Sequence, residues 1–352
     1  MEIKSFLHTL LATIILSCIP TASSYANMAK IFKELSFHTL TNRQVEVPQT
    51  ELLADLKALP DSALSPAGKA IKSILLIDRN AVLPNDITTV YQTPGPLGSK
   101  ECRKDTCCVW KYIADDMAKT FKDPKTNECN ELARQAIRLG FHDAATWSKT
   151  LGDGGADGSI ILANEWKREE NLGLESISPQ IKTWYNKWHT HGAGMADLIQ
   201  MAANVATVTC PLGPRVKSFV GRNDSYKAAP EGRLPKVDAS AESLIALFED
   251  KTVVLGELVA LLGAHTTSRQ RFVDKSRADA PQDTTPGIWD VSFYNETISE
   301  TPAPDIFILE SDLAIARYSD QSRAFWETFA NPANEQGAWN NVSYGSSRWS
   351  VW

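Results

Sequence analysis

Apolar positions recur with a helical period along most of the chain from residue 108 onward. In six segments they fall three and four positions apart, whereas strand-like alternation is scarce between them. This pattern predicts a mainly α protein. The segments are VWKYIADDMAKTF, NELARQAIRLGFHDA, GMADLIQMAANVAT, SAESLIALFED, LGELVALLGAHTT and LESDLAIARYSDQSRAFWETFA. Gly- and Pro-containing loops at 150–180, 211–238 and 270–305 connect them, and connections of that length need a reason.

The N-terminus has a different pattern. A mostly apolar run at residues 6–19 follows Lys4 and precedes the small residues TASSYA, which is the layout of a secretory signal peptide. A membrane anchor is the alternative, but the run is too short and is interrupted by His8 and Thr9. We therefore expect residues 1–26 to be removed on secretion. No later run is apolar enough to span a bilayer, so we expect no membrane association.

Residues 27–98 are interpreted as an N-terminal extension or linker, with a helix-like stretch at 52–59 and a loop-like end, TPGPLGS. The whole chain has 352 residues, of which 43% are hydrophobic and 22% charged, so it has material for a large packed core. A formal charge of −6 provides no basic surface for phosphate backbones and argues against a nucleic-acid partner.

Cysteine usage agrees with export. Six cysteines stand at positions 18, 102, 107, 108, 129 and 210, and removal of residues 1–26 leaves five. No matching Cys-x-x-Cys pairs are present, so these cysteines indicate disulfides rather than zinc ligands, with one thiol left over. N-glycosylation tripeptides at Asn223, Asn295 and Asn341 also predict a secreted glycoprotein.

Two histidines lie in segments built for burial. Arg138 and His142 are four positions apart and project from one helix face. His265 continues an apolar stripe, at a place where leucine would be expected. A buried neutral imidazole needs a partner for each nitrogen, and a metal with a carboxylate would satisfy both. The alternative for each histidine is a hydrogen-bonded core residue.

Two loops are rich in oxygen ligands. GDGGADGS offers Asp153, Asp157 and Ser159, and APQDTTPGIWD offers Asp283, Thr285 and Asp290. Carboxylates and hydroxyls at short spacing suit Ca²⁺, whereas zinc would need His and Cys. An ordinary Asx-rich turn is the alternative for either loop alone. Because each loop follows one of the two histidines, we favour calcium.

Taken together, RLGFHDA, GGADGSI, EENLGL, LLGAHTTSR, DTTPGIWD and ESDLAIAR resemble the secreted fungal haem peroxidases. These form class II of the plant-type peroxidase superfamily, which includes lignin and manganese peroxidases. The resemblance implies a two-lobed helical fold with haem b between distal and proximal helices. It places the peroxidase domain at residues 99–332 and leaves 333–352 as an atypical, shortened tail.

The resemblance also implies roles for individual residues. Arg138 and His142 would lie above the haem with Phe141 near the porphyrin, and the Asn171 carbonyl would accept the His142 Nδ1 proton. His265 would bind the iron, with Asp312 accepting its other N–H. Two calcium ions would be held at a distal site, Asp143, Gly155, Asp157 and Ser159, and at a proximal site, Thr266, Asp283, Thr285, Ile288 and Asp290.

The implied activity is peroxide-dependent oxidation. His142 would take a proton from hydrogen peroxide and return it to the outer oxygen while Arg138 stabilises the developing charge. A ferryl haem intermediate would then oxidise small phenolic or similar aromatic donors by one electron at a time. We expect an extracellular monomer. An intracellular peroxidase using ascorbate or a cytochrome is disfavoured by the signal peptide, paired cysteines and calcium loops.

The chain departs from the family at four internal positions. Ala260 stands where lignin-oxidising relatives have a surface tryptophan. Glu131, Gln135 and Arg271 stand where manganese peroxidases have three acidic residues. These departures predict a generic peroxidase. Gln282 replaces a usual phenylalanine beside the proximal calcium aspartate.

The C-terminal region departs further. The family continues with another helix and a cysteine-bearing tail, so we expect truncation of this chain or an altered reading of its coding sequence. The implied disulfides, Cys102–Cys108 and Cys129–Cys210, leave Cys107 unpaired. The alternative function is therefore an unstable, non-catalytic remnant that binds calcium and haem without turnover.

Overall fold

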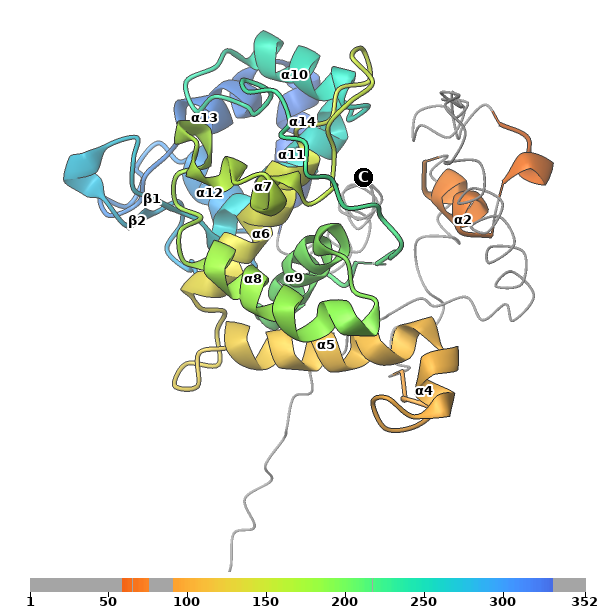
Figure 1. Ribbon diagram of the computed structural model, residues 1–352. Coiled ribbons are helices and arrows are strands. Elements are labelled where there is room, and N and C mark those ends of the chain that lie inside the picture. Colours follow the sequence, from red (N-terminus) through yellow and green to blue (C-terminus); the bar gives the residue numbers. More distant parts are fainter. Residues whose placement is uncertain (1–58, 65, 76–90, 217, 332–352) are drawn as a thin grey trace, which may run out of the picture.

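The computed structural model describes residues 59–64, 66–75, 91–216 and 218–331 (Figure 1). The signal peptide, most of the extension, Asn341 and the tail at 333–352 lie outside the described residues. The described part is mostly helical with one pair of two-residue strands, so the mainly α prediction is confirmed. None of the helices that the structure describes is long and apolar enough to cross a bilayer.

The elements follow one another with few long gaps. The first half contains η2 Asp61–Ala63, α2 Pro66–Leu75, α4 Lys100–Lys104, α5 Thr106–Phe121, α6 Glu131–Ala144, α7 Ser159–Leu162, η3 Glu165–Lys167, η4 Glu169–Asn171, α8 Ile177–Trp188, η5 His189–His191 and α9 Met195–Thr209. The second half contains α10 Ala241–Asp250, α11 Leu255–Leu262, η6 Gly263–Thr267, β1 Arg269–Gln270, η7 Lys275–Arg277, β2 Ala280–Pro281, α12 Ser292–Thr297, α13 Glu310–Arg317 and α14 Asp320–Ala330.

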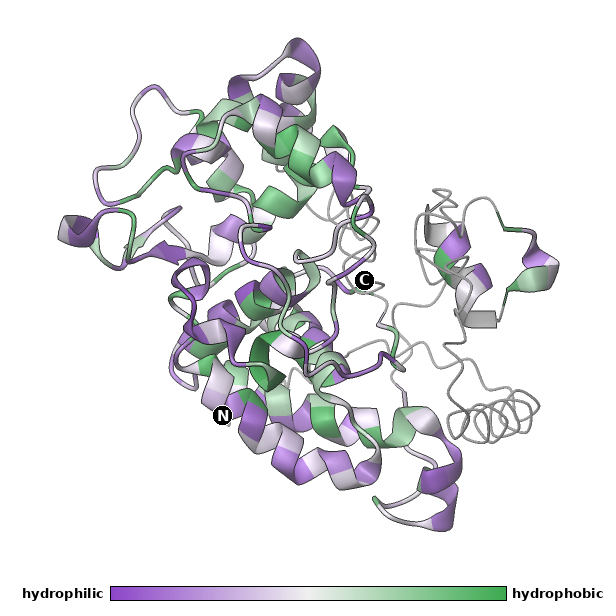
Figure 2. Ribbon diagram, turned by 45° about the horizontal axis from the view of Figure 1, so that its top comes forward, coloured by the Kyte–Doolittle hydropathy of each residue, from purple (hydrophilic) through white to green (hydrophobic). Residues whose placement is uncertain are grey.

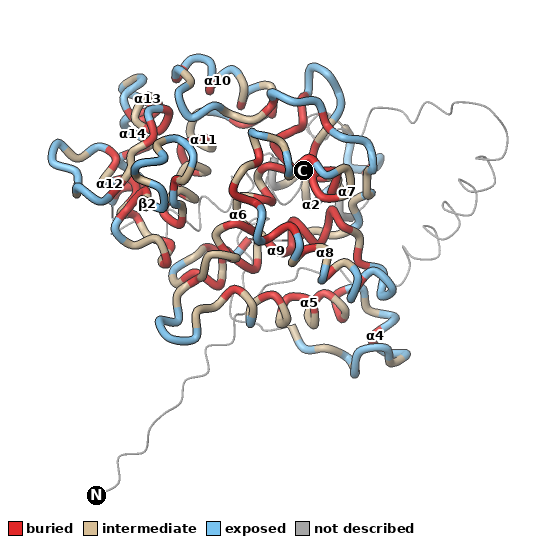
Figure 3. The backbone as a smooth tube through the Cα atoms, turned by 60° about the vertical axis from the view of Figure 1, so that its left-hand side comes forward, coloured by how far each residue is buried: buried red, intermediate tan, exposed pale blue. Residues whose placement is uncertain are grey.

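Two groups of helices form the body. Figure 1 shows α5, α8 and α9 on one side and α10 to α14 on the other, with α6 and α7 between them. One continuous core includes Trp110, Leu139, Leu198, Leu258 and Trp326 from both groups, and a small separate cluster surrounds Leu64. Figure 3 shows this buried zone in red along α6 and α9, and Figure 2 shows hydrophobic and hydrophilic residues on the same helices. The apolar faces of the amphipathic helices thus point toward the core.

Helix α6 carries the distal motif and is fixed by local chemistry. Asn130 caps its start, because its side chain accepts a hydrogen bond from Ala133 N. Gly140 lets α6 approach α9, since a Cβ there would lie 2.5 Å from Ala203 Cβ. Gln200 Nε2 on α9 also donates to Gly140 O at 3.0 Å. The close packing of α6 on α9 therefore depends on a small residue beside the functional turn.

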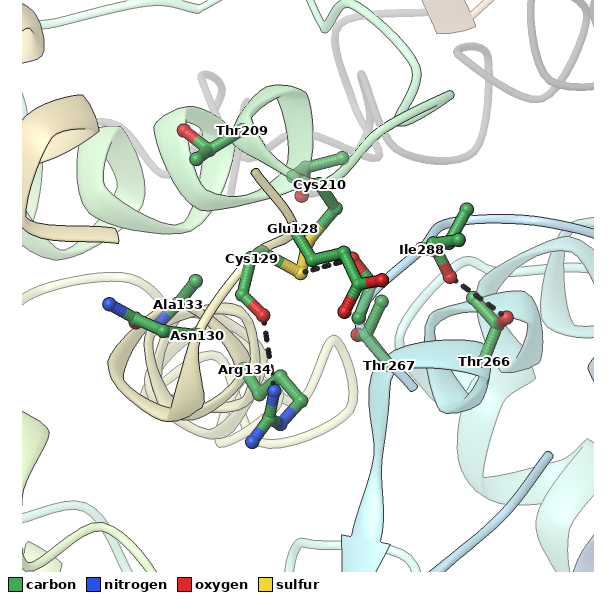
Figure 4. Close-up of a disulfide and its surroundings, with 12 residues drawn as sticks. Glu128, Cys129, Asn130, Ala133, Arg134, Thr209, Cys210, Thr266, Thr267 and Ile288 are labelled. Atoms are coloured by element: carbon green, nitrogen blue, oxygen red, sulfur yellow. Dashed lines mark hydrogen bonds between the residues drawn. A yellow bond between two sulfur atoms is a disulfide. The ribbon is translucent and has the colours of Figure 1, made fainter. Parts of the chain in front are cut away.

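The disulfides Cys102–Cys108 and Cys129–Cys210 are both present, as the resemblance implied. The second joins the start of α6 to the end of α9 (Figure 4). Cys129 N also donates to Gly287 O at 3.2 Å, so the bridge adjoins the loop that holds Ile288. This one bridge therefore fastens two helices and a loop.

The prediction that Cys107 is unpaired is wrong. Cys107 is buried and disulfide-bonded, and the described residues contain no free cysteine. The partner of Cys107 lies outside the described residues. The prediction failed because it took the cysteine pairing from the resemblance, which gave Cys107 no partner in this chain.

Two apolar segments break where the sequence pattern predicted continuity. The segment at 309–330 forms α13 and α14, because the Ser319 hydroxyl accepts from Ser322 N and starts a new helix. The segment at 255–267 leaves the α conformation after Leu262, so His265 stands on the 3₁₀ turn η6. Thr267 Oγ1 donates to Ala264 O at 3.0 Å there, a local bond that competes with a regular helix.

Candidate active site

The distal side of the site is built on the last turns of α6. His142 is buried, and its Nδ1 lies 2.7 Å from Asn171 Oδ1 on η4. Asn171 Nδ2 donates to Glu165 O at 2.9 Å, and this bond fixes which amide atom faces the ring. An amide oxygen only accepts, so Nδ1 carries the proton. Nε2 is left as the acceptor, and here it accepts from Arg138 Nε at 3.1 Å.

Electrostatics keep His142 neutral. Burial and then the Arg138 charge lower the pKa of His142 to about 3, although the Asn171 hydrogen bond acts in the opposite direction. Burial also lowers the pKa of Arg138 to about 10, which leaves the guanidinium charged at neutral pH. Arg138 Nη1 donates to Leu172 O, and Phe141 meets the His142 ring edge-on at 5.7 Å between centroids. A neutral base and a fixed cation thus stand side by side.

The proximal side is built on η6 and α13. His265 Nδ1 lies 2.9 Å from Asp312 Oδ2, and Phe293 meets the ring edge-on at 5.6 Å between centroids. Burial disfavours protonation of His265, but the Asp312 charge and hydrogen bond outweigh it and raise the pKa of His265. The His265 side chain keeps 32% of its surface exposed, whereas Asp312 keeps 1%.

The two histidines lie within reach of one cation. The Arg138 charge lowers the pKa of His265 as well as that of His142. Within the described residues, Nε2 of His265 forms no hydrogen bond, while Nδ1 is held by Asp312. An imidazole anchored on one nitrogen and open on the other fits the residue that would hold haem iron.

The first oxygen cluster follows α6. Asp143 is buried, and its carboxylate accepts from Gly158 N at 3.0 Å and Ile160 N at 3.4 Å. Ser159 N donates to Asp157 Oδ1 at 3.0 Å, and Asp157 N donates to Gly155 O at 2.8 Å. Burial, reinforced by the charge of Asp157, raises the pKa of Asp143. A buried carboxylate beside a half-buried one fits a cation.

The second oxygen cluster follows η6. Thr266 Oγ1 lies 2.5 Å from Asp283 Oδ2. It also lies 3.4 Å from Ile288 O (Figure 4). Thr285 Oγ1 lies 2.8 Å from Asp290 Oδ2, and Thr285 N donates to Asp283 Oδ1 at 2.9 Å. Burial raises the pKa of Asp283 to about 7 despite the Thr266 and Thr285 hydrogen bonds.

The donor set of both clusters suits calcium better than zinc. In the described part of the chain, no three His, Cys, Asp or Glu residues come together as a metal site. Each cluster instead combines two carboxylates with hydroxyl groups and backbone carbonyls. Hard oxygen ligands of this kind are those that Ca²⁺ takes, whereas structural zinc takes Cys and His.

The three positions that correspond to the acidic residues of manganese peroxidases lie in one ionic network. Glu131 Oε1 lies 2.8 Å from both Arg271 Nη1 and Gln135 Nε2, and Glu131 Oε2 lies 2.9 Å from Arg134 Nη2. Burial raises the pKa of Glu131, but these hydrogen bonds and charges outweigh it and lower the pKa. The Glu131 carboxylate is therefore already paired with Arg134 and Arg271. Ala260 is buried, so its side chain places no group at the surface.

Sequence reasoning missed two cations that hold the segment after α6. Lys251 is buried and donates to Trp147 O at 3.0 Å, and Arg233 Nη1 donates to Thr146 O at 2.9 Å. Burial lowers the pKa of Lys251 to about 8, with Asp250 acting in the opposite direction. In the sequence, Lys251 appears only as a lysine that follows a helix, and such lysines are typically exposed.

The sequence of this chain is similar to those of fungal peroxidases. The family described as Peroxidase matches residues 113–332. A ligninase of Phanerodontia chrysosporium is 33% identical over 248 residues, which cover 64% of this chain and 65% of the ligninase. A peroxidase of Coprinopsis cinerea is 29% identical over 275 residues, covering 70% of this chain and 74% of that protein. A low-redox potential peroxidase of Taiwanofungus camphoratus is 33% identical over 234 residues, covering 61% and 69%.

Proposed function

Because this chain belongs to the peroxidase family, we propose that it uses hydrogen peroxide to oxidise small phenolic or similar aromatic donors in one-electron steps. One observation carries the proposal. The Asn171 carbonyl holds the Nδ1 proton of His142, so that Nε2 is a neutral base beside the Arg138 guanidinium. That arrangement suits proton removal from peroxide followed by stabilisation of negative charge.

The distal residues perform the proton chemistry. His142 Nε2 exchanges its hydrogen bond from Arg138 for one from peroxide, accepts the peroxide proton, and delivers it to the departing oxygen. Arg138 stabilises the negative charge that develops on that oxygen as the O–O bond breaks. Asn171 keeps the ring in the required tautomer throughout, because its own amide is fixed by Glu165 O.

The proximal residues would hold haem b. His265 would bind the iron through Nε2, while Asp312 orients the ring and makes it a more basic ligand. Bound haem would supply the redox chemistry that the side chains of this site do not provide.

We further propose two calcium ions, one in each oxygen cluster. The distal ion would be held by Asp143, Gly155, Asp157 and Ser159, and the proximal ion by Thr266, Asp283, Thr285, Ile288 and Asp290. Asp143 adjoins His142, and Thr266 adjoins His265. Calcium would therefore fix the backbone beside each functional histidine and relieve the repulsion between the two carboxylates of each cluster.

The donor class follows from what the site lacks. Glu131 is neutralised by Arg134 and Arg271, so it offers no vacant carboxylate for manganese. Ala260 offers no ring for electron transfer from a bulky substrate. Small aromatic donors remain the class that this site suits. The disulfides support secretion to the extracellular space, because such bridges persist in oxidising compartments.

The test is the absorption spectrum of the purified protein loaded with haem, followed by phenolic dye oxidation with and without peroxide. A Soret band and strictly peroxide-dependent turnover are expected. A loaded protein that binds haem and calcium but gives no turnover would instead favour the non-catalytic remnant. That alternative has lost one of its two supports, since Cys107 is disulfide-bonded.

A further inference from the structure

A buried glutamine contacts the carboxylate that holds the proximal histidine. Gln282 is 3% exposed and lies between Ser268 and Asp312. Gln282 Nε2 donates to Asp312 Oδ2 at 3.1 Å, and the Ser268 hydroxyl donates to Gln282 Oε1. The backbone N–H of Gln282 also donates to Ser268 O at 3.1 Å, so both ends of the glutamine are fixed.

The partners settle the orientation of the Gln282 amide. A carboxylate only accepts hydrogen bonds, so the amide nitrogen must face Asp312. The Ser268 hydroxyl then donates to the amide oxygen. That bond polarises the amide and strengthens its N–H as a donor to Asp312.

Two donors share a single oxygen of Asp312. His265 Nδ1 lies 2.9 Å from Oδ2, the same atom that accepts from Gln282. The other oxygen, Oδ1, is buried without a hydrogen-bond partner among the described residues. The two donors therefore compete for this oxygen, and a stronger hydrogen bond from Gln282 weakens the hydrogen bond between Asp312 and the His265 N–H.

We propose that Gln282 is a positioning residue that weakens the hold of Asp312 on the His265 N–H and thereby raises the reduction potential of bound haem iron. A stronger hydrogen bond gives the imidazole more anionic character, which favours ferric over ferrous iron. The inference rests on the proposed function, because it requires His265 to bind the iron. It concerns a position where the resembling family usually has phenylalanine, which could fill the space but could not donate.

The test compares Gln282→Met with Gln270→Met in the full haem-loaded chain. Methionine has a similar size and lacks the donor. Gln270 is also buried, but its amide donates to Asp274 O and Arg277 O and makes no contact with Asp312. We expect Gln282→Met to shift the ferric-to-ferrous equilibrium about tenfold toward ferric iron, a fall of about 59 mV. We expect no shift for Gln270→Met.

A second variant and a second readout guard against simple unfolding. Ser268→Ala keeps the amide but removes the hydroxyl that polarises it, so a smaller fall in potential is expected. The iron–histidine stretching frequency of the ferrous protein should rise in Gln282→Met, a signature that loosened packing would not produce.

The outcomes separate the two proposals. An unchanged or higher potential in Gln282→Met, or equal falls in both glutamine variants, overturns the role of Gln282 while leaving the peroxidase assignment intact. If the wild-type chain binds no haem through His265, the proposed function fails and the role of Gln282 fails with it.

Discussion

At the residue scale, the proton chemistry of the distal site depends on hydrogen-bond partners that allow a side chain only one orientation. The His142 tautomer follows from Asn171, whose amide follows in turn from the Glu165 backbone carbonyl. The base is therefore set by a backbone atom 23 positions away from it in a separate short helix. Such a chain of dependence predicts a sharp effect from single substitutions.

Substitution of His142 is the most direct test of the distal site. We expect His142→Ala to slow the reaction with peroxide by roughly 100- to 10,000-fold, because the proton acceptor is lost. Haem retention should be unaffected, since His265 lies on the opposite side of the proposed site. Stopped-flow absorbance with peroxide measures this directly. His189→Ala is the matched control, because His189 is exposed on η5. Equal rates in wild type and His142→Ala would contradict the assignment.

The glycosylation tripeptides differ in how free their asparagines are. Both asparagines are exposed, but Asn223 lies in a loop, whereas Asn295 lies in α12 and its Nδ2 donates to Ala330 O at 2.9 Å and Val291 O at 3.3 Å. We expect Asn223 to carry the glycan and Asn295 to carry none. In protein secreted from a eukaryotic host, Asn223→Gln should abolish one endoglycosidase-sensitive mass step, and Asn295→Gln should not. A mass step lost in Asn295→Gln would contradict this expectation.

At the element scale, α6 is held at both ends by groups distant in sequence. The disulfide Cys129–Cys210 lies before its first turn, and Asp143 enters the distal oxygen cluster at its last turn. Lys251 and Arg233 then donate to the carbonyls of the segment that follows. The position of His142 therefore depends on contacts outside its own helix.

Calcium removal should loosen the elements on both sides of the site. Without a cation, buried Asp143 faces half-buried Asp157 and buried Asp283 faces half-buried Asp290, which costs stability. Calcium at a hundredfold excess over its Kd would contribute about 2.7 kcal/mol per site and about 5.4 kcal/mol for both, so chelation should lower Tm by on the order of 10–20 °C. Thermal unfolding with chelator, then with calcium restored, measures this. Magnesium should restore little, because it demands a more rigid geometry. An unchanged Tm after chelation would refute both calcium sites.

Lys251 should make stability depend on alkaline pH. Burial lowers its pKa from 10.5 to about 8 in the folded chain, so between these values the unfolded chain binds more protons. Folding stability contributed by this group therefore rises as pH increases through that window. Lys251→Met should lack this rise, and the exposed Lys149→Met should keep it. Urea unfolding of the three proteins at pH 7.5 and about pH 10 tests this; parallel pH profiles would show that Lys251 is solvated.

At the scale of the whole molecule, the sequence predicted what is encoded locally. Helical periodicity located α5, α6, α9, α10, α11, α13 and α14 but missed α7, α8 and α12. His265 stood out because it continues the stripe of Leu258. Long-range contacts left no such pattern. Lys251 and Trp147 are 104 positions apart, and Arg233 and Thr146 are 87 apart. Each looks like a surface residue until the fold brings it to a carbonyl.

The two described disulfides also differ in sequence separation, and we expect the long-range bridge to contribute more to stability. Cys129–Cys210 spans 81 positions and joins helices of one lobe to the loop of the proximal cluster, whereas Cys102–Cys108 spans only 6. Loop-closure entropy predicts that replacing both cysteines by serine costs about 4.5 kcal/mol for the long bridge and about 2 kcal/mol for the short one. Denaturant unfolding of the two double variants measures the difference.

Activity gives an independent check on that comparison. The variant that lacks Cys129–Cys210 should retain normal peroxide kinetics per folded, haem-loaded molecule. Neither cysteine takes part in the hydrogen bonds that hold His142 and Arg138. If the two double variants lose equal stability, the bridge acts locally rather than by restricting the unfolded chain. The fold would then owe the register of α6 and α9 to their packing at Gly140 alone, and Gly140→Ala, whose Cβ would approach Ala203 Cβ to 2.5 Å, would be the more damaging change.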